Sequence, residues 1–219
     1  MIACLLVLLV LLAAQGAAPA AALEDTAAVP YLPWVEVVRA PAQPASLFCT
    51  PAGGGSSFAA ADAFGGGDID AGLEIILYSD EPPWGTPIAH FPAEDIWLEA
   101  SEGSLVACPG GTVADANTDA AGRTGWALPL RVGGTLDRNT GARLLVLVNG
   151  YASMGQGELL LGVTSADLNG DGQVALSDAG LFTQDLFGAY AYRSDFVWDG
   201  VINISDAGRM SQALGQRCP

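Results

Sequence analysis

The chain has 219 residues, of which 51% are hydrophobic and 15% charged, and its formal net charge is −16. This length and composition allow one or two globular domains with a real apolar core. The 24 acidic residues outnumber eight basic ones, so the surface lacks the Lys and Arg clusters that bind phosphates, which argues against a nucleic-acid partner.

The chain begins with an apolar segment followed by small residues. The run from Met1 to Leu12 is too short for a comfortable membrane span, and Ala20 to Ala22 offers a small-residue cleavage site. We interpret residues 1–22 as a signal peptide, with an uncleaved anchor as the competing interpretation, and residues 23–29 as a linker. The expected product is secreted, extracellular or at a cell surface, with no membrane span after signal cleavage.

Residues 30–164 carry short apolar runs separated by turn residues. β-branched and aromatic residues concentrate in the runs, while Gly, Pro and Asp, including the pair Gly133–Gly134, punctuate the chain between them. The predicted strands are 34–38, 45–49, 73–78, 95–99, 112–114, 124–132, 143–148 and 158–161. No long helical period competes, so we expect a mainly β fold with an immunoglobulin-like (Ig-like) β-sandwich over 30–164.

Three cysteines follow the predicted signal peptide, and export permits disulfides. Cys49 and Cys108 both fall within the predicted sandwich, and bridging them would stabilise the fold by roughly 4 kcal/mol through loop-closure entropy. We favour this pair. Cys218 is then left without a partner in this pairing. It is free, paired between molecules, or paired with another cysteine of the chain if the favoured pair is wrong.

Candidate catalytic groups are sparse. The one histidine, His90, lies in an alternating, strand-like stretch, where a structural role is expected, and no Ser-His-Asp or Cys-His arrangement can be built around it. An acidic cluster offers carboxylates of the kind that cleave glycosides, but an exposed charged strand edge is the simpler interpretation. Its members are Glu94, Asp95, Glu99 and Glu102. We therefore expect a protein that is not an enzyme.

Two twelve-residue segments, 167–178 and 195–206, place acidic residues at their first, fifth and twelfth positions. Calcium takes ~6–8 oxygen ligands, which alternate carboxylates, a turn glycine and a closing carboxylate can supply in an EF-hand-type loop. An ordinary Asp/Gly/Asn turn is the simpler alternative for one such segment. Two segments in matched frames, 28 residues apart from 167 to 195, favour calcium.

The two predicted calcium sites are unequal. In the first loop every expected position carries oxygen: Asp167, Asn169, Asp171, the Gln173 carbonyl and Asp178. The second loop offers Asp195, Asp199, the Val201 carbonyl, Asn203 and Asp206. Val197 replaces an oxygen donor at the third position there, and Asn203 or a water has to compensate, so we expect the second site to be weaker. In both loops the closing residue is Asp rather than the usual Glu, which limits bidentate reach.

Each loop precedes a stretch with apolar residues at helical spacing, whereas residues 158–164 before the first loop indicate a strand. The helical positions are Leu181, Phe182, Leu186, Phe187, then Ala207, Met210 and Leu214. This duplicated loop-and-helix segment resembles a dockerin, the module that plugs into cohesin domains on extracellular scaffolds. The resemblance implies a small α-helical calcium module over 165–219 and a cohesin-like partner. It also implies partner contacts at the helix starts, at Leu176, Ser177, Ile204 and Ser205.

A second resemblance concerns the β region. Residues 73–80, 85–89 and 117–124 follow an order similar to that of bacterial Ig-like adhesin and stalk domains, which implies a surface-associated sandwich without catalytic residues. The expected function is extracellular attachment or assembly by a secreted, non-catalytic calcium-binding protein. The alternative is a carbohydrate-binding or self-assembling surface or filament protein with purely structural calcium. Candidate partners are therefore a cohesin-like domain, a second copy of the chain, or a polysaccharide on which Trp84, in a Pro-rich turn, could stack.

Overall fold

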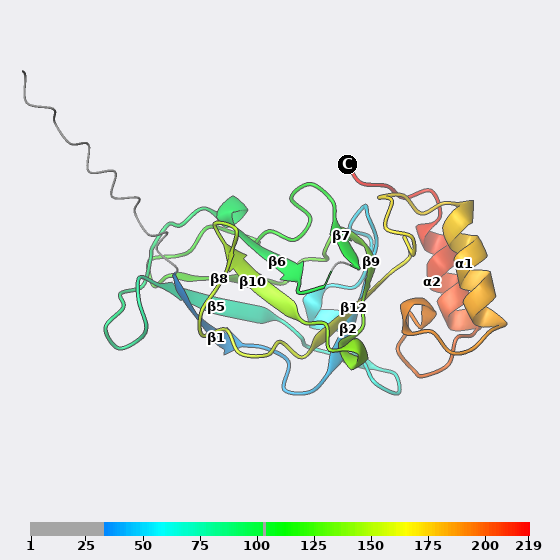
Figure 1. Ribbon diagram of the computed structural model, residues 1–219, viewed down its shortest axis with the longest axis horizontal. Coiled ribbons are helices and arrows are strands. Elements are labelled where there is room, and N and C mark those ends of the chain that lie inside the picture. Colours follow the sequence, from blue (N-terminus) through cyan, green and yellow to red (C-terminus); the bar gives the residue numbers. More distant parts are fainter. Residues whose placement is uncertain (1–32, 103) are drawn as a thin grey trace, which may run out of the picture. The chain divides into compact units, whose positions relative to one another are not determined.

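Figure 1 shows the computed structural model, which describes residues 33–219 except residue 103. The predicted signal peptide (1–22) and linker (23–29) lie outside the described residues. The described chain is mainly β, as the short apolar runs predict, and carries three sheets and two α-helices. Within it, no helix combines the length and apolar character that a membrane crossing requires.

The strands are arranged in two three-stranded sheets and one six-stranded sheet. The first sheet has the order β1 (Trp34–Arg39), β5 (Leu73–Tyr78), β8 (Arg123–Trp126). The second has the order β11 (Tyr151–Ala152), β10 (Leu144–Val148), β6 (Ile96–Ala100). The third has the order β4 (Asp68–Ile69), β3 (Ala61–Ala63), β2 (Ala45–Cys49), β12 (Leu161–Ser165), β9 (Val132–Leu136), β7 (Leu105–Ala107). Strands β2 and β12 pair in parallel, and the other strand pairs are antiparallel.

Three of the strand predictions need correction. The predicted strand 124–132 divides into β8 and β9, because Pro129 between them has no N–H to donate to a ladder. Residues 112–114 form no strand, and Val113 makes only an isolated bridge to Trp97. The last strand begins at Leu161 and runs to the edge of the first loop.

Strands β2 and β12 are buried on both faces. Leu47 of β2 lies in the core that all three sheets share, whereas the next residue, Phe48, lies in a second apolar cluster with the helices. On β12, Val163 joins the first core, while Gly162 lies against Tyr192. Because successive side chains point to opposite faces of a strand, the second face of this sheet supports the C-terminal segment.

The C-terminal segment has two helices and its own apolar cluster. Helix α1 (Leu176–Leu186) follows the first loop and α2 (Ile204–Ala213) follows the second, as the apolar spacing predicts. Phe196 lies within the cluster, with ring-centroid distances of 5.0 Å to Phe48 and 5.7 Å to Phe182. Phe187 and Leu214, both predicted at apolar helical positions, instead lie exposed just beyond the ends of α1 and α2. Four 3-10 helices complete the described elements: η1 (Phe58–Ala60), η2 (Ala93–Asp95), η3 (Arg138–Thr140) and η4 (Tyr192–Ser194).

The disulfide joins Cys108 to Cys218, with a Cα–Cα distance of 5.4 Å, so the predicted Cys49–Cys108 pair is wrong. In the third sheet, β12 and β9 separate β2, which ends at Cys49, from β7, which Cys108 follows. Cys49 lies with Leu47 in the core that the three sheets share, whereas the Cys108 sulfur lies 3.4 Å from the Pro51 carbonyl and bonds to Cys218. Cys49 is a free, buried thiol, and burial raises its pKa to about 12.

Candidate metal centre

The first loop folds around the carboxylate of Asp167. This side chain is fully buried and accepts backbone N–H bonds from Gly170 (2.9 Å), Asp171 (3.1 Å) and Gly172 (2.8 Å). Gly170 and Gly172 have φ values of 71° and 86°, which glycine adopts without steric strain. The loop backbone therefore encloses the carboxylate at its first position.

The closing residue of the first loop is held equally firmly. Asp178 is fully buried in the first turn of α1 and accepts N–H bonds from Asn169 (3.1 Å) and Ala175 (2.9 Å). Asn169 also donates its side-chain N–H to Asp171 (3.0 Å), whose carboxylate accepts the Gln173 N–H (3.0 Å). The structure thus links all five predicted donor residues of the first loop through one hydrogen-bond network.

The second loop repeats this network at equivalent positions. Asp195 is fully buried and accepts N–H bonds from Asp199 (3.2 Å) and Gly200 (2.9 Å). Asp206, also fully buried, accepts from Val197 (3.1 Å) and Asn203 (2.9 Å). Each bond has its counterpart 28 positions earlier, so the two loops share a backbone frame as well as a sequence pattern.

The second loop lacks a side-chain oxygen at its third position, where the first loop has Asn169. Val197 contributes no side-chain oxygen, and Asn203 uses its amide oxygen to accept the Ser205 N–H (2.8 Å) at the start of α2. The Val201 carbonyl accepts a bond from the Asn203 amide (3.3 Å). The hydroxyl of Tyr190 donates to Asp195 (2.9 Å), a contact without a counterpart at Gly162 in the first repeat.

The first-position carboxylates are costly to keep charged. Burial raises the pKa of Asp167 and that of Asp195 above the ordinary aspartate range, and the hydrogen bonds that each accepts offset only part of this effect. A buried carboxylate needs a compensating charge or protonation. A divalent cation is often the largest local charge in such a site and reverses this pKa shift.

The chemistry of the donor set suits calcium. Among the described residues, no group of three or more His, Cys, Asp and Glu side chains gathers into a metal cage. Each loop instead combines carboxylates with amide and backbone carbonyl oxygens. These hard oxygen ligands favour calcium over softer metals.

The β region contacts the first loop directly. The Gly134 N–H on β9 donates to the Asp167 carbonyl (2.7 Å), and a Cβ atom at Gly133 would overlap the Asp167 carboxylate. The sequence pattern indicated a turn at these two glycines, but both lie within β9. Their lack of side chains lets the loop lie directly against the sheet.

A partly buried ion pair and a cation–π contact hold α2 against the β region. Arg209 donates two bonds of 2.7 Å to Asp62 on β3, and its guanidinium carbon lies 5.3 Å from the Phe48 ring centroid. The hydroxyls of Tyr192 and Ser46 form a buried 2.8 Å hydrogen bond nearby. Sequence reasoning missed these contacts because nothing local marks Asp62 and Arg209 as partners.

The predicted partner-contact residues lie at the surface. Leu176 and Ile204 occupy the first position of α1 and α2, and each is 84% exposed. Ser177 and Ser205 beside them are exposed as well. Contact with the β region therefore leaves both helix starts accessible.

The other candidate groups are dispersed. Glu94 and Asp95 lie in η2, and Glu99 on β6 accepts the indole N–H of Trp97 (3.1 Å). His90 lies in a turn with φ 58° rather than in the expected strand. Trp84 is 79% exposed.

Comparison with known proteins found no matching family model, no matching curated sequence and no matching solved structure.

Proposed function

We propose that this is a secreted, non-catalytic protein that binds calcium at two loops and mediates extracellular attachment or assembly. In this proposal an Ig-like β-sandwich precedes a dockerin-like tandem calcium module over residues 165–219. The observation that carries it is the duplicated hydrogen-bond frame, in which the first and twelfth aspartates of both loops are fully buried.

Burial of four carboxylates distinguishes these loops from ordinary turns. Aspartates in surface turns normally keep their charge in water, whereas taking an isolated carboxylate out of water is costly. The ion pairs found in the described part of the chain involve none of the four. A calcium ion in each loop would supply the positive charge and would stiffen the segment on binding.

The ranking of the two sites follows from their donors. The first loop brings oxygen to every expected position, with Asn169 and Asp171 between the two buried aspartates. The second lacks a side-chain donor at Val197, where the first loop has Asn169. We therefore assign the higher calcium affinity to the first loop.

The attachment role is supported by the exposed helix starts. Large apolar side chains exposed at equivalent positions of two repeats, such as Leu176 and Ile204, are candidates for a protein interface. A cohesin-like domain or a second copy of this chain is the partner that the proposal names. Calcium would control the interface by fixing the loop that ends at each helix start.

A second candidate function rests on Trp84. Its ring is 79% exposed in a Pro-rich turn, which suits stacking on a sugar face. In that case the protein would bind a polysaccharide through its β region, and calcium would only stabilise the C-terminal segment.

The test compares the full-length chain with a Leu176→Ser/Ile204→Ser double variant in calcium and in chelator. Self-association is measured by sedimentation, and binding is measured to cohesin domains and to insoluble polysaccharides. The proposal predicts association that chelator and the double variant both abolish, while Leu128→Ser, at an exposed residue of the β region, leaves it intact. Polysaccharide binding that is lost in Trp84→Ala and unchanged by chelator would favour the second function. Calcium binding without association in any of these assays would leave the metal with a structural role alone.

A further inference from the structure

The C-terminal tail, residues 215–218, forms a short antiparallel ladder with residues 172–174 of the first loop. Val174 donates its backbone N–H to the tail (2.8 Å) and accepts an N–H from it (2.9 Å). The Cys218 N–H donates to the Gly172 carbonyl (2.8 Å). The tail thus pairs with the part of the loop that contains its turn glycine and its carbonyl donor.

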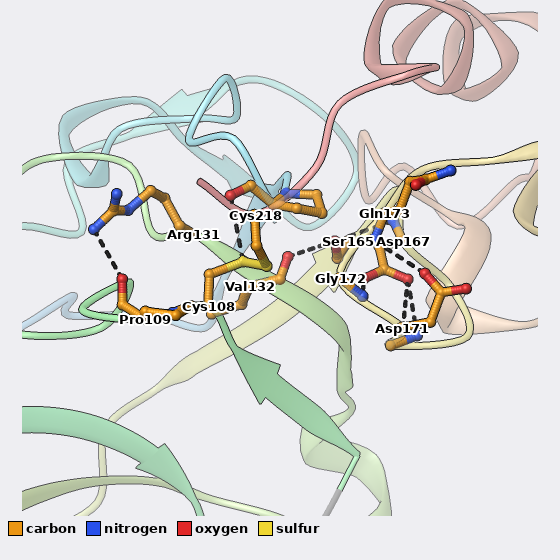
Figure 2. Close-up of a disulfide and its surroundings, with 12 residues drawn as sticks. Cys108, Pro109, Arg131, Val132, Ser165, Asp167, Asp171, Gly172, Gln173 and Cys218 are labelled. Atoms are coloured by element: carbon orange, nitrogen blue, oxygen red, sulfur yellow. Dashed lines mark hydrogen bonds between the residues drawn. A yellow bond between two sulfur atoms is a disulfide. The ribbon is translucent and has the colours of Figure 1, made fainter.

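The same tail is covalently tied to the β region. Cys218 forms the disulfide with Cys108, which is buried just beyond β7 and donates its N–H to the Arg131 carbonyl (3.0 Å). Figure 2 shows this disulfide beside Gly172 and Asp167. A Cβ atom at Gly172 would lie 3.2 Å from the Cys218 sulfur, so the bridge is in close contact with the turn of the loop.

The second loop has no such tail. Within residues 33–219, no backbone ladder reaches positions 200–202, which correspond to 172–174. A backbone hydrogen bond from the β region reaches the second loop at Trp198 instead, whose carbonyl accepts the Gly65 N–H (3.1 Å). The second loop is therefore a control within the same molecule.

We propose that the Cys108–Cys218 disulfide and calcium binding at the first loop are energetically coupled through the C-terminal tail. This inference rests on the proposed calcium function. With the bridge closed, the ladder holds residues 172–174 in place. With the bridge open, the tail is retained by noncovalent contacts alone, so the fraction of molecules with an ordered first loop falls. Apparent affinity falls in proportion to that fraction.

The size of the coupling follows from the ladder. A released tail forfeits three backbone hydrogen bonds, and losing the net contribution of even one or two weakens calcium binding about tenfold. Linkage is reciprocal, so calcium must make the disulfide harder to reduce by the same factor. For a two-electron couple, a tenfold factor is a shift of about 30 mV toward a more negative reduction potential.

The redox step is ordinary thiol–disulfide exchange. The Cys108–Cys218 bond accepts two electrons and two protons from a dithiol such as dithiothreitol, which leaves as its cyclic disulfide, and two protein thiols result. The buried Cys49 is already a thiol and takes no part.

The experiment uses two full-length variants that each retain one intact loop. Asp199→Ala removes the fifth-position carboxylate of the second loop, and Asp171→Ala is the matched change in the first. Calcium affinity is measured by calorimetry for each variant oxidised, reduced with dithiothreitol, and with Cys108→Ser/Cys218→Ser added. Opening the bridge should weaken calcium about tenfold in Asp199→Ala and less than about twofold in Asp171→Ala.

A second measurement begins with the native oxidised protein and does not require the reduced chain to fold. Calcium should slow reduction of the bridge by dithiothreitol in Asp199→Ala and leave it unchanged in Asp171→Ala, and the equilibrium potential should shift by about 30 mV in the first variant only. Equal effects in both variants, or none in Asp199→Ala, would overturn the coupling while leaving calcium binding established. Absence of calcium binding in both oxidised variants would overturn the proposed function itself.

Discussion

Phe48 is the residue through which β2 contributes to the apolar cluster of the C-terminal segment, so its truncation should loosen that segment selectively. The ring is 7% exposed, 5.0 Å from the Phe196 ring centroid, and 5.3 Å from the Arg209 guanidinium carbon. Phe→Ala at a buried site costs about 3–5 kcal/mol, and loss of the cation–π contact adds ~1 kcal/mol. We expect Phe48→Ala to lower the free energy of unfolding residues 165–219 by about 5 kcal/mol.

Hydrogen exchange followed residue by residue is the assay, because it separates local opening from global unfolding. In chelator, amides of α1 and α2 should lose protection in Phe48→Ala, while those of β5 and β10 keep theirs. Leu47→Ala is the control on the same strand, since Leu47 lies in the core that the three sheets share, and it should lower protection of the sheets. If Phe48→Ala lowered protection in β5 and β10 as much as in the helices, the two regions would open as one unit and the reasoning would be refuted.

Three further predictions concern the loops. Gly133→Ala should push against the Asp167 carboxylate and weaken calcium at the first loop at least about tenfold by calorimetry, whereas Gly180→Ala, where a Cβ meets open space, should not weaken it. Val197→Asn should strengthen the second loop about three- to tenfold by restoring the third-position oxygen, and an unchanged second affinity would contradict the ligand assignment. The raised pKa values of Asp167 and Asp195 mean that the folded, metal-free protein binds protons more tightly than the unfolded chain does. Its denaturation free energy should therefore rise as pH falls from neutral through those raised pKa values and level off below pH ~4, and in calcium the trend should reverse because protons compete with the cation.

The parts of the structure that follow local rules could be predicted from the sequence. The strands β1, β2, β5 and β10 were predicted within a residue or two at each end, because each is a short apolar run bounded by turn residues. The starts of α1 and α2 follow from apolar spacing after a loop whose closing aspartate accepts the N–H of the residue before the helix. These signals depend only on residues close together in the chain.

The parts that depend on sheet order could not be predicted. The Cys49–Cys108 prediction failed because a single sequence does not show that Cys49 lies in the shared core while Cys108 meets the C-terminal tail. Likewise, the contact of Phe48 with the C-terminal cluster and the pairing of Asp62 with Arg209 join residues that lie far apart in the chain. Gly133 looked like a turn residue because a glycine pair is typical of turns. Its role in the structure is to let the first loop approach β9 closely, and that role gives the same local sequence pattern.

The most direct test of the account is calcium calorimetry on the oxidised, full-length chain. We expect two sites of unequal affinity and, in Asp171→Ala, loss of most binding at the tighter one with the weaker site retained. A single site, two sites with the second loop tighter, or no calcium binding at all would contradict it.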